Sequence, residues 1–424
     1  MGFSTAISGL NAASNLLSTT GNNIANANTT GFKRSRSEFA DVYASGLGGV
    51  SKSTPGAGVV IANVAQQFDQ GNLELTGNGL DLAISGEGFF ALGDSTINPQ
   101  QKVYTRAGMF HADEEGYIVN NSGEALLAYR PNGNTVAEGF STGIMQTLQV
   151  DSSQGQPQPT TKISTGVNLD ASKQAPTLSF VGPSGGVVDP NTYTHTSSVT
   201  VYDSLGNPHV ASQYFVKTAN PMEWDIYTYV DGRDIKGSVP PASPIADKLT
   251  FDNVGKLISP VNGQFIYPPI TVAPNAQDLA ITLDLNGSTQ LGSPFSVNSL
   301  SQDGLPTGRL SGLDIDDTGI VFARYTNGAS KPLGQVALVR FQNSQGLSKL
   351  GDTAWGENTD SGPPISGVAK TGSFGTIKAG ALESSNVDLA AQLVTLIVAQ
   401  QAYQANAQTI TTENQVVQTL LNVR

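Results

Sequence analysis

The sequence predicts an α+β protein of several domains, with terminal coiled-coil helices forming one domain and the middle of the chain forming two mainly antiparallel β domains. Three observations carry this prediction. Apolar residues at both ends recur at spacings of three and four, which is typical of helices. Between the ends, Asn-Gly and Asp-Gly pairs separate runs that alternate apolar and polar residues, which is typical of hairpins. The length of 424 residues exceeds that of most single domains.

The first helix is expected within residues 1–33. Its seam has the spacing of a coiled coil, with small residues between four large ones. The large seam residues are Phe3, Leu10, Leu17 and Ile24. Gly9 and Gly21 each weaken such a helix by about 1 kcal/mol relative to Ala. The helix is therefore expected to need a partner for stability.

A longer second helix is expected within residues 384–424. The seam positions are Leu389, Leu393, Leu396, Gln400, Tyr403, Ala407, Ile410, Asn414, Val417 and Leu421. Other apolar residues flank this stripe, so the apolar arc is wider than contact with one helix requires. The terminal helices are expected to pair as an inner domain and to leave apolar surface for polymerisation with other copies. The alternative is a helical hairpin that only covers a β domain of the same chain.

The middle of the chain is expected to contain one β domain inserted into another. The polar, Pro-bearing segment 151–159 marks the first crossing between them. Residues 76–150 and 311–383 would then form the middle β domain, and residues 151–310 the inserted outer one. An insertion into a hairpin loop keeps its two ends close, which makes this nesting sterically easy.

Residues 34–75 are expected to link the first helix to the middle β domain. The stretch from 31 to 57 is rich in glycine, which makes its backbone permissive. It also carries charges that are expected to form exposed, exchangeable ion pairs worth about 0–1 kcal/mol each. These residues are Lys33, Arg34, Arg36, Lys52, Glu38 and Asp41. Ion pairs this weak can be remade as neighbouring copies slide, so the stretch is interpreted as a flexible joint.

Composition and charge exclude several classes of protein. Lys and Arg number 22 against 34 Asp and Glu, a formal net charge of −12, so the basic footprint that nucleic acid or anionic lipid requires is missing. There is no cysteine, and neither a disulfide framework nor a thiolate metal site is expected. No apolar run is long enough for a membrane span, and the first residues do not resemble a signal peptide. If the protein is extracellular, we expect an export route that keeps its N-terminus.

Two motifs resemble functional sites, a calcium loop and a nucleophile elbow, but the residues around each do not fit such a site. Residues 314–319 resemble a calcium loop, but Thr318 and Tyr325 stand where an EF-hand needs Asp or Asn and Glu. A β-turn is therefore expected there. Residues 182–186 fit the spacing of a nucleophile elbow, but no helical pattern follows them. A loop is expected instead.

The remaining candidates for catalysis or metal binding are isolated. The three histidines lack metal-ligand spacing and are expected at the surface or in turns. They are His111, His195 and His209. We therefore expect no catalytic residue, no cofactor and no metal, and we do not expect an enzyme.

Short motifs at both ends resemble a known family. Those near the N-terminus are SGL at 8–10, NNIAN at 22–26 and TGFK at 30–33. Those near the C-terminus are GALESSNVDL at 380–389, AQQAYQAN at 399–406 and LLNVR at 420–424. Together they resemble the terminal signatures of the bacterial flagellar rod and hook family, although Gln401 stands where that family more often has Arg. Three further motifs resemble the longer hook subunits of that family: SVTVYDSLGNPH at 198–209, YTNG at 325–328 and LGQVAL at 333–338.

The resemblance implies a structural subunit of a flexible curved tube, a universal joint that transmits motor torque from rod to filament and encloses an export channel. The terminal helices would form the inner layer and the two β domains the outer layers. The implied partners are further copies of the chain, the distal rod protein, the hook cap protein, the hook–filament junction protein and the flagellar type III export apparatus. The implied location is extracellular, above the basal body, with no cleaved signal peptide, no nucleic-acid partner and no insertion into a membrane.

A different class of protein stays open from the residues alone. An extracellular adhesin or binding module would need an exposed aromatic cluster in the 151–310 domain, and Trp224, Tyr227 and Tyr229 are the candidates. Alternation along a strand places Tyr227 and Tyr229 on one face, which is more often a core face than a binding face.

Overall fold

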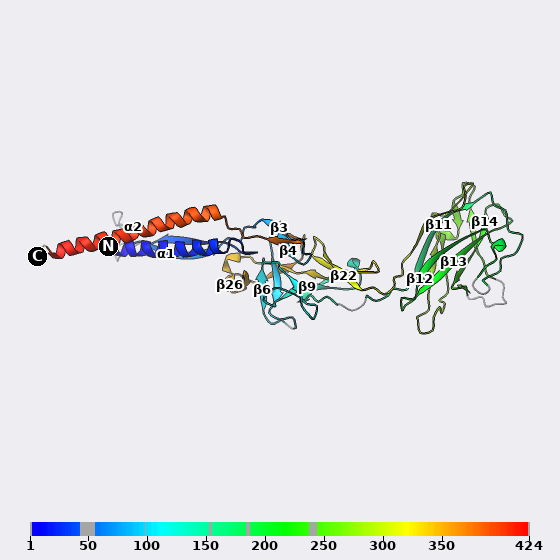
Figure 1. Ribbon diagram of the computed structural model, residues 1–424, viewed down its shortest axis with the longest axis horizontal. Coiled ribbons are helices and arrows are strands. Elements are labelled where there is room, and N and C mark those ends of the chain that lie inside the picture. Colours follow the sequence, from blue (N-terminus) through cyan, green and yellow to red (C-terminus); the bar gives the residue numbers. More distant parts are fainter. Residues whose placement is uncertain are drawn as a thin grey trace. The chain divides into compact units, whose positions relative to one another are not determined.

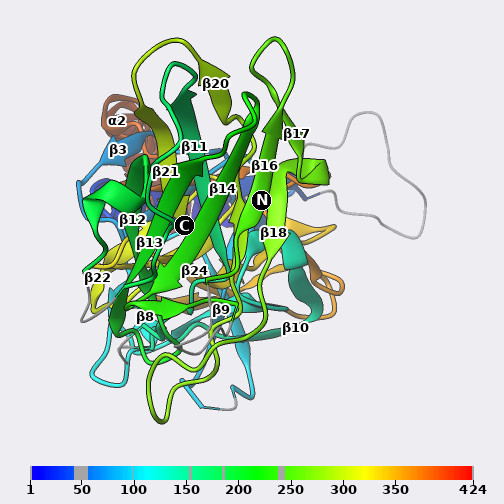
Figure 2. The same cartoon turned by 90° about the vertical axis from the view of Figure 1, so that its right-hand side faces the viewer.

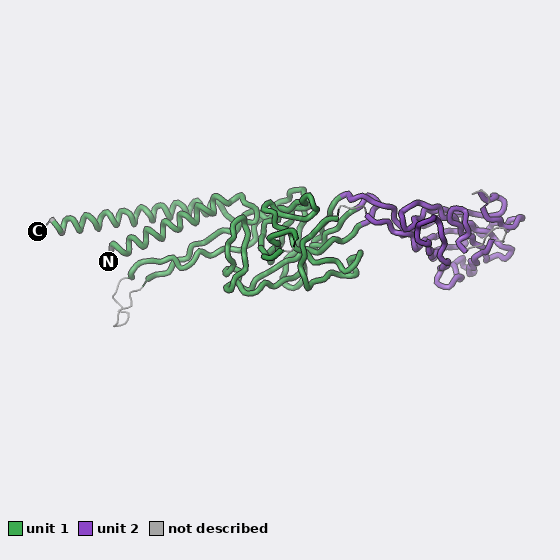
Figure 3. The backbone as a smooth tube through the Cα atoms, turned by 90° about the horizontal axis from the view of Figure 1, so that it is seen from below, with its two compact units in different colours: residues 1–152, 312–324, 330–424 green, residues 153–311, 325–329 purple. Residues whose placement is uncertain are grey.

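The chain forms two compact units (Figure 3). The structure is a computed structural model that describes residues 2–42, 56–97, 99–151, 155–183, 187–236 and 244–422. The first unit comprises Met1–Ser152, Gly312–Arg324 and Ser330–Arg424. The second unit comprises Ser153–Ser311 and Tyr325–Ala329. The second unit is therefore an insertion in the sequence of the first, and each unit is described by itself.

Two α-helices of the first unit, α1 (Gly2–Ala25) and α2 (Leu389–Asn422), lie side by side and antiparallel (Figure 1). Near one end of the pair, Asn23 Nδ2 donates to Gln392 Oε1 at 3.0 Å, and further along Gly9 lies against Asn406. The Asp388 carboxylate accepts hydrogen bonds from backbone N–H groups in the first turn of α2, which fixes where that helix begins. With 34 residues against 24, α2 extends past the N-terminal end of α1.

A two-stranded antiparallel ribbon, β1 (Ser35–Asp41) with β2 (Val59–Gln66), lies beside α1. Ser37 Oγ donates to Thr19 Oγ1 at 2.9 Å, and the Val59 N–H donates to Ser8 Oγ at 3.2 Å. The expected linker, residues 34–75, thus contains paired strands in contact with a helix, because the β-branched run of β2 favours a strand over irregular chain. Residues 43–55 of that segment lie outside the described residues.

The rest of the first unit is a β domain made from both flanks of the insertion. Its strands before the insertion are β3 (Leu73–Leu75), β4 (Leu82–Ser85), β5 (Phe89–Gly93), β6 (Lys102–Thr105), β7 (His111–Ala112), β8 (Ile118–Val119), β9 (Ala125–Pro131) and β10 (Phe140–Thr147). Those after it are β22 (Leu310–Ile315), β23 (Ile320–Tyr325), β24 (Ser330–Val336), β25 (Leu338–Arg340), β26 (Ser348–Gly351), β27 (Ala354–Gly356), β28 (Ile365–Gly367), β29 (Thr376–Ala379) and β30 (Ala381–Glu383). Strands β22 and β23 extend across the boundary into residues of the second unit.

Pairing between the two flanks holds this β domain together. One large sheet runs in the order β22-β23-β24-β9-β5-β6-β27-β26, and the small antiparallel ladders β3–β30 and β4–β29 join the flanks next to the helices. Its aromatic core contains Phe89 edge-on to Trp355 at 5.7 Å and Tyr104 edge-on to Phe341 at 4.8 Å. Residues about 250 positions apart in sequence therefore share one core.

The second unit is built of two packed sheets. Its strands are β11 (Lys162–Asp170), β12 (His195–Tyr202), β13 (Pro208–Lys217), β14 (Glu223–Val230), β15 (Arg233–Asp234), β16 (Asp247–Phe251), β17 (Leu257–Ser259), β18 (Gln264–Ile266), β19 (Thr282–Asp284), β20 (Thr289–Leu291) and β21 (Ser296–Gln302). Figure 2 shows β12, β13 and β14 side by side in one antiparallel sheet. The other sheet has the order β18-β19-β11-β20, in which β11 pairs in parallel with β19 and β20.

The core of the second unit lies between these sheets. It includes the fully buried Trp224, Phe215, Ile163 and Leu283. On the other face of the antiparallel sheet, Tyr229 is buried with Phe180, and Tyr227 stacks on Phe180 with ring centroids 4.1 Å apart. The aromatic residues that an adhesin would need exposed are therefore divided between two packed faces.

Candidate assembly interface

The large seam residues of α1 are not its most buried residues. Within the pair, the buried positions are the small or polar Ala6, Ala13, Thr20 and Asn23. Leu10, Leu17 and Ile24 are half-buried, and Phe3 exposes 46% of its surface. Close approach of the two helices at the small residues leaves the large apolar side chains along the flank of the contact.

The predicted seam residues of α2 are only partly covered. Leu396, Ala407 and Ile410 are half-buried, whereas the large residues Leu389, Leu393, Tyr403, Val417 and Leu421 are exposed. The residues of α2 nearest to α1 lie one position to the side of the predicted stripe and include Gln392, Ala399 and Asn406. The contact with α1 therefore covers one edge of the predicted stripe and leaves the rest exposed.

Gly9 is a point of close approach between the two helices. A Cβ on Gly9 would lie 2.6 Å from Asn406 Oδ1, so the glycine lets α2 approach closely along a polar and small-residue face. Much of the apolar stripe of α2 remains exposed within the chain. Besides the exposed seam residues, α2 exposes Val394, Ile397, Val398 and Val416.

A buried charge cluster, consisting of Lys33, Arg106 and Glu383, lies where both helices join the β domain. Lys33 Nζ is 2.5 Å from Glu383 Oε1, and Arg106 Nη1 is 3.1 Å from Glu383 Oε2. The three side chains expose 1%, 6% and 0% of their surface, in the order Lys33, Arg106, Glu383. Burial lowers the pKa of Lys33 and of Arg106, and the Glu383 carboxylate opposes both shifts.

The prediction that Lys33 forms an exposed, exchangeable ion pair is therefore wrong. Its partner is Glu383, 350 positions away in the sequence, which no local charge pattern could indicate. The prediction fits the rest of the segment better: Arg36 pairs with Glu38 at 2.6 Å on the surface, and Arg34 lies 3.8 Å from the exposed Asp69. Asp41 is exposed, and Lys52 lies outside the described residues.

The histidines are placed differently from the expectation of surface or turn positions. His111 is exposed in β7, as expected. His195 is stacked on Phe295 at 4.4 Å, and burial lowers its pKa. His209 is buried, with Nδ1 2.6 Å from Asp231 Oδ2 and Nε2 3.4 Å from Asp203 Oδ2. Because different ring nitrogens face the two carboxylates, this arrangement is an ion-pair network and does not converge on one metal position.

The calcium-like segment 314–319 forms a tight turn between β22 and β23. Asp316 Oδ1 accepts hydrogen bonds from the backbone N–H groups of Thr318 and Ile320 and from the Thr318 hydroxyl. The carboxylate is thus occupied with the turn itself. In the described part of the chain, no group of three or more His, Cys, Asp or Glu side chains is arranged to hold a metal ion.

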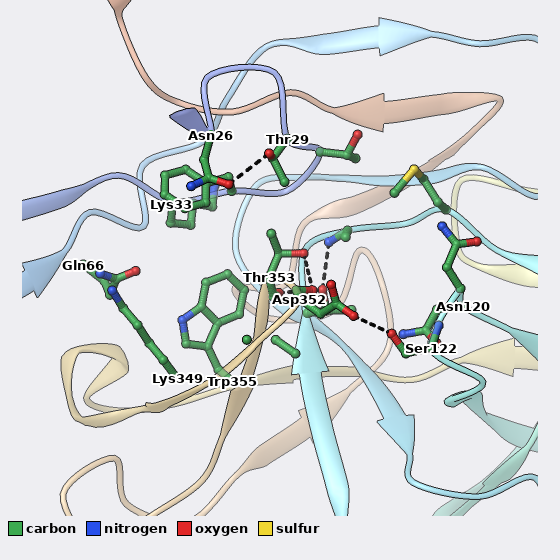
Figure 4. Close-up of a pocket in the computed structure, with 18 of the residues that line it drawn as sticks. Asn26, Thr29, Lys33, Gln66, Asn120, Ser122, Lys349, Asp352, Thr353 and Trp355 are labelled. Carbon is green, nitrogen blue, oxygen red and sulfur yellow. Dashed lines mark hydrogen bonds between the residues drawn. The ribbon is translucent and has the colours of Figure 1, made fainter. Parts of the chain in front are cut away.

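A cavity of about 530 Å³ in the first unit lies at the base of α1 (Figure 4). Amide and hydroxyl side chains make up about half of the lining residues, among them Asn26, Thr29 and Asn120, and the ring of Trp355 also lines the cavity. Ser122 Oγ donates to Asp352 Oδ2 at 2.7 Å, but the lining contains no histidine to act as a base for that hydroxyl. The cavity does not have the arrangement of a catalytic site.

Two α-helices occur in the described part of the chain, and neither combines the length and apolar character that crossing a bilayer requires.

Four family models match this chain in order along its length. They are the flagella basal body rod protein at residues 3–33, the flagellar hook protein FlgE/F/G D1 domain at 83–165, the flagellar basal body protein FlaE D2 domain at 168–305 and the flagellar basal body rod FlgEFG protein C-terminal at 378–423. A crystal structure of the Helicobacter pylori flagellar hook protein FlgE2 superposes with a TM-score of 0.52 at 18% identity, covering 73% of this chain and all of that one. This likeness supports the α+β fold class expected from the sequence.

Full-length relatives are similar over the whole chain. The flagellar hook protein FlgE of Escherichia coli is 39% identical over 431 aligned positions that cover 100% of both chains. The FlgE protein of Salmonella typhimurium is 38% identical, and the alignment covers 100% of both chains. The FlgE protein of Rhizobium meliloti is 35% identical, and the alignment covers 99% of this chain and 98% of the relative. These identities confirm the resemblance that the terminal motifs indicated. The chain therefore belongs to the flagellar hook protein FlgE family and is a structural subunit of the bacterial flagellar hook.

Proposed function

We propose that this subunit polymerises through the apolar stripe of α2 together with the half-buried flank of α1. The observation that carries the proposal is the uncovered stripe itself. It includes Leu389, Leu393, Val394, Ile397, Val398, Tyr403, Val416, Val417 and Leu421. Monomeric proteins rarely leave this many large apolar side chains of one helix in water, which supports contact with other copies as their role.

The polymer would be a tube in which the helices form the inner layer, around a central channel, and the β domains the outer layers. A flexible tube of this kind would transmit motor torque as a universal joint between rod and filament. The proposed partners besides further copies are the distal rod protein, the hook cap protein, the hook–filament junction protein and the flagellar type III export apparatus. The proposed location is extracellular, in the flagellum. The role is mechanical, and we propose no catalytic activity.

Charged substitutions in the stripe test this proposal. Leu393→Asp and Ile397→Asp place a carboxylate on residues that expose 49% and 53% of their surface, so the fold of the chain is unaffected while contacts between copies lose apolar area and gain buried charge. Sedimentation and negative-stain electron microscopy should show tubes from the unchanged chain and only monomers from both variants.

The matched control is Asn134→Asp, which adds the same charge at an exposed position in the loop between β9 and β10, outside both helices. We expect this variant to form tubes. Near-UV circular dichroism checks that every variant keeps its aromatic packing. Tubes from the Leu393→Asp and Ile397→Asp chains would contradict the proposal.

A further inference from the structure

The buried charge cluster joins parts of the chain that are far apart in sequence. Glu383 ends β30, directly before the segment that leads into α2, and Lys33 follows α1. Arg106 belongs to the β domain and follows β6. The Glu383 carboxylate thus links both terminal segments to the β domain. Its Oε1 accepts a hydrogen bond from Lys33, and its Oε2 accepts one from Arg106.

Backbone groups add further hydrogen bonds to these side chains, although the buried Arg106 Nε has no partner among the described residues. Glu383 Oε1 also accepts from the Gly71 N–H at 2.8 Å, and Lys33 Nζ donates to the Asp69 carbonyl at 2.8 Å. Arg106 Nη2 donates to the Gly86 carbonyl at 2.8 Å. Each charged group is therefore bonded to a backbone group, which can move only if a strand or the loop next to it moves as well.

A second set of contacts surrounds the cluster. The Gly31 N–H donates to the Glu383 carbonyl at 2.7 Å, and Asn386 Oδ1 accepts from the Arg34 N–H at 2.8 Å. Asn386 Nδ2 donates to the carbonyls of Gln67 and Asp69. The segments that leave α1 and enter α2 are therefore bonded to each other and to the connection between β2 and β3, which leads into the β domain.

From these contacts we propose that Lys33, Arg106 and Glu383 are positioning residues, which hold the helix pair in one orientation against the β domain. Buried ion pairs are inefficient stabilisers, because desolvation offsets their attraction, but their directional hydrogen bonds select one geometry. The base of the helices is then a rigid connection. In the polymer proposed above, bending must be accommodated elsewhere, and the exposed pairs of β1 do not act as a hinge between helix and β domain.

The absence of cysteine from the sequence allows a direct test on the full, unassembled chain. Glu114→Cys in the β domain and Gln408→Cys in α2 replace exposed residues and provide two unique sites for nitroxide labels. Double electron–electron resonance then reports the distribution of distances between helix pair and β domain. We expect a narrow distribution in the otherwise unchanged chain, and a distribution about twofold broader for Lys33→Met, which removes the ammonium group.

Arg36→Met is the matched control, because it removes a cation from the exposed pair with Glu38. It should leave the distribution narrow. If Lys33→Met fails to fold, the triple variant Lys33→Met, Arg106→Met, Glu383→Met replaces the cluster by apolar side chains and leaves no uncompensated buried charge. We expect it to keep the near-UV circular dichroism of the β domains and to show the broad distribution.

Three results would overturn the positioning role: a broad distribution in the unchanged chain, a narrow one in the folded variants, or loss of the fold in the triple variant as well. None of these measurements requires tubes. A failure of the proposed polymerisation would instead appear in sedimentation of the chain without labels, so the two proposals fail separately.

Discussion

His209 lies between two acidic side chains of the second unit, each of which also organises a turn. The Asp203 carboxylate accepts from the N–H groups of Leu205 and Asn207, and Asp231 Oδ1 accepts from the Val210 N–H. Burial by itself lowers the pKa of His209, but the hydrogen bonds to Asp231 and Asp203 outweigh burial and raise the pKa above its ordinary value. When His209 is protonated, its imidazolium links the turns that carry Asp203 and Asp231.

This network makes the stability of the second unit depend on pH. The folded pKa of His209 is raised above the ordinary 6.5, so its contribution is fully present below that pH and is lost as pH rises through the folded pKa. Unfolding by urea between about pH 5 and pH 9 should show His209→Gln less stable than the unchanged chain at the acidic end by about 1.5–3 kcal/mol, with the difference shrinking at the basic end. His111→Gln, an exposed histidine in the first unit, should show no such trend. An equal loss at all values of pH would contradict a charged His209.

At the scale of the elements, two glycines of α1 have opposite surroundings. A Cβ on Gly21 would meet no atom within 4 Å, whereas a Cβ on Gly9 would lie 2.6 Å from Asn406 Oδ1. Glycine in a helix costs stability in both places, but only Gly9 is required by the close approach of α2. The packing of the pair thus depends on one position more than on the other.

Matched substitutions test this difference. Gly21→Ala should raise the stability of the helix pair by about 0.5–1 kcal/mol, because alanine removes the conformational cost of glycine without a clash. Gly9→Ala should raise the stability of the helix pair by less than half of the gain from Gly21→Ala, or should lower it, because the new Cβ must displace the Asn406 side chain. Thermal melting followed by circular dichroism at 222 nm (the helix band) measures both. Equal gains for the two variants would show that α2 does not approach α1 closely at Gly9.

At the scale of the whole molecule, the two units have separate cores. Trp224 is fully buried in the second unit, and Trp355 is buried against Phe68 and Phe89 in the first. The aromatic contacts of each indole stay within its own unit. Each unit can therefore lose its core independently of the other.

Calorimetry of the full chain should accordingly show two unfolding transitions. Trp224→Ala should lower only the transition of the second unit, and Trp355→Ala only that of the first, each by about 3–5 kcal/mol in stability. Intrinsic fluorescence of the remaining tryptophan assigns each transition to its unit. A single transition that both substitutions shift alike would contradict separate cores.

Local patterns in the sequence were sufficient for the elements and their class. The three-four spacing predicted both terminal helices, and turn pairs such as Asn286-Gly287 and Asn327-Gly328 coincide with glycines at positive φ. The terminal motifs predicted the family. These features depend on residues within a few positions of one another, and such neighbours are set by the chain itself.

The tertiary structure alone decided which surfaces meet. The spacing predicted that the two terminal helices pair, but it did not indicate that α2 approaches α1 closely at Gly9 and Asn406 and leaves Leu389 and Leu393 exposed. The sequence predicted Lys33 to be an exposed charge. It is buried against Glu383, which also binds Arg106, and both of these residues belong to distant segments of the chain. The sequence predicted His209 to lie at the surface or in a turn. It is instead buried between the carboxylates of Asp203 and Asp231. Periodicity fixes the side of a helix or strand on which a residue lies, but burial and charge pairing depend on chain segments that only folding brings together.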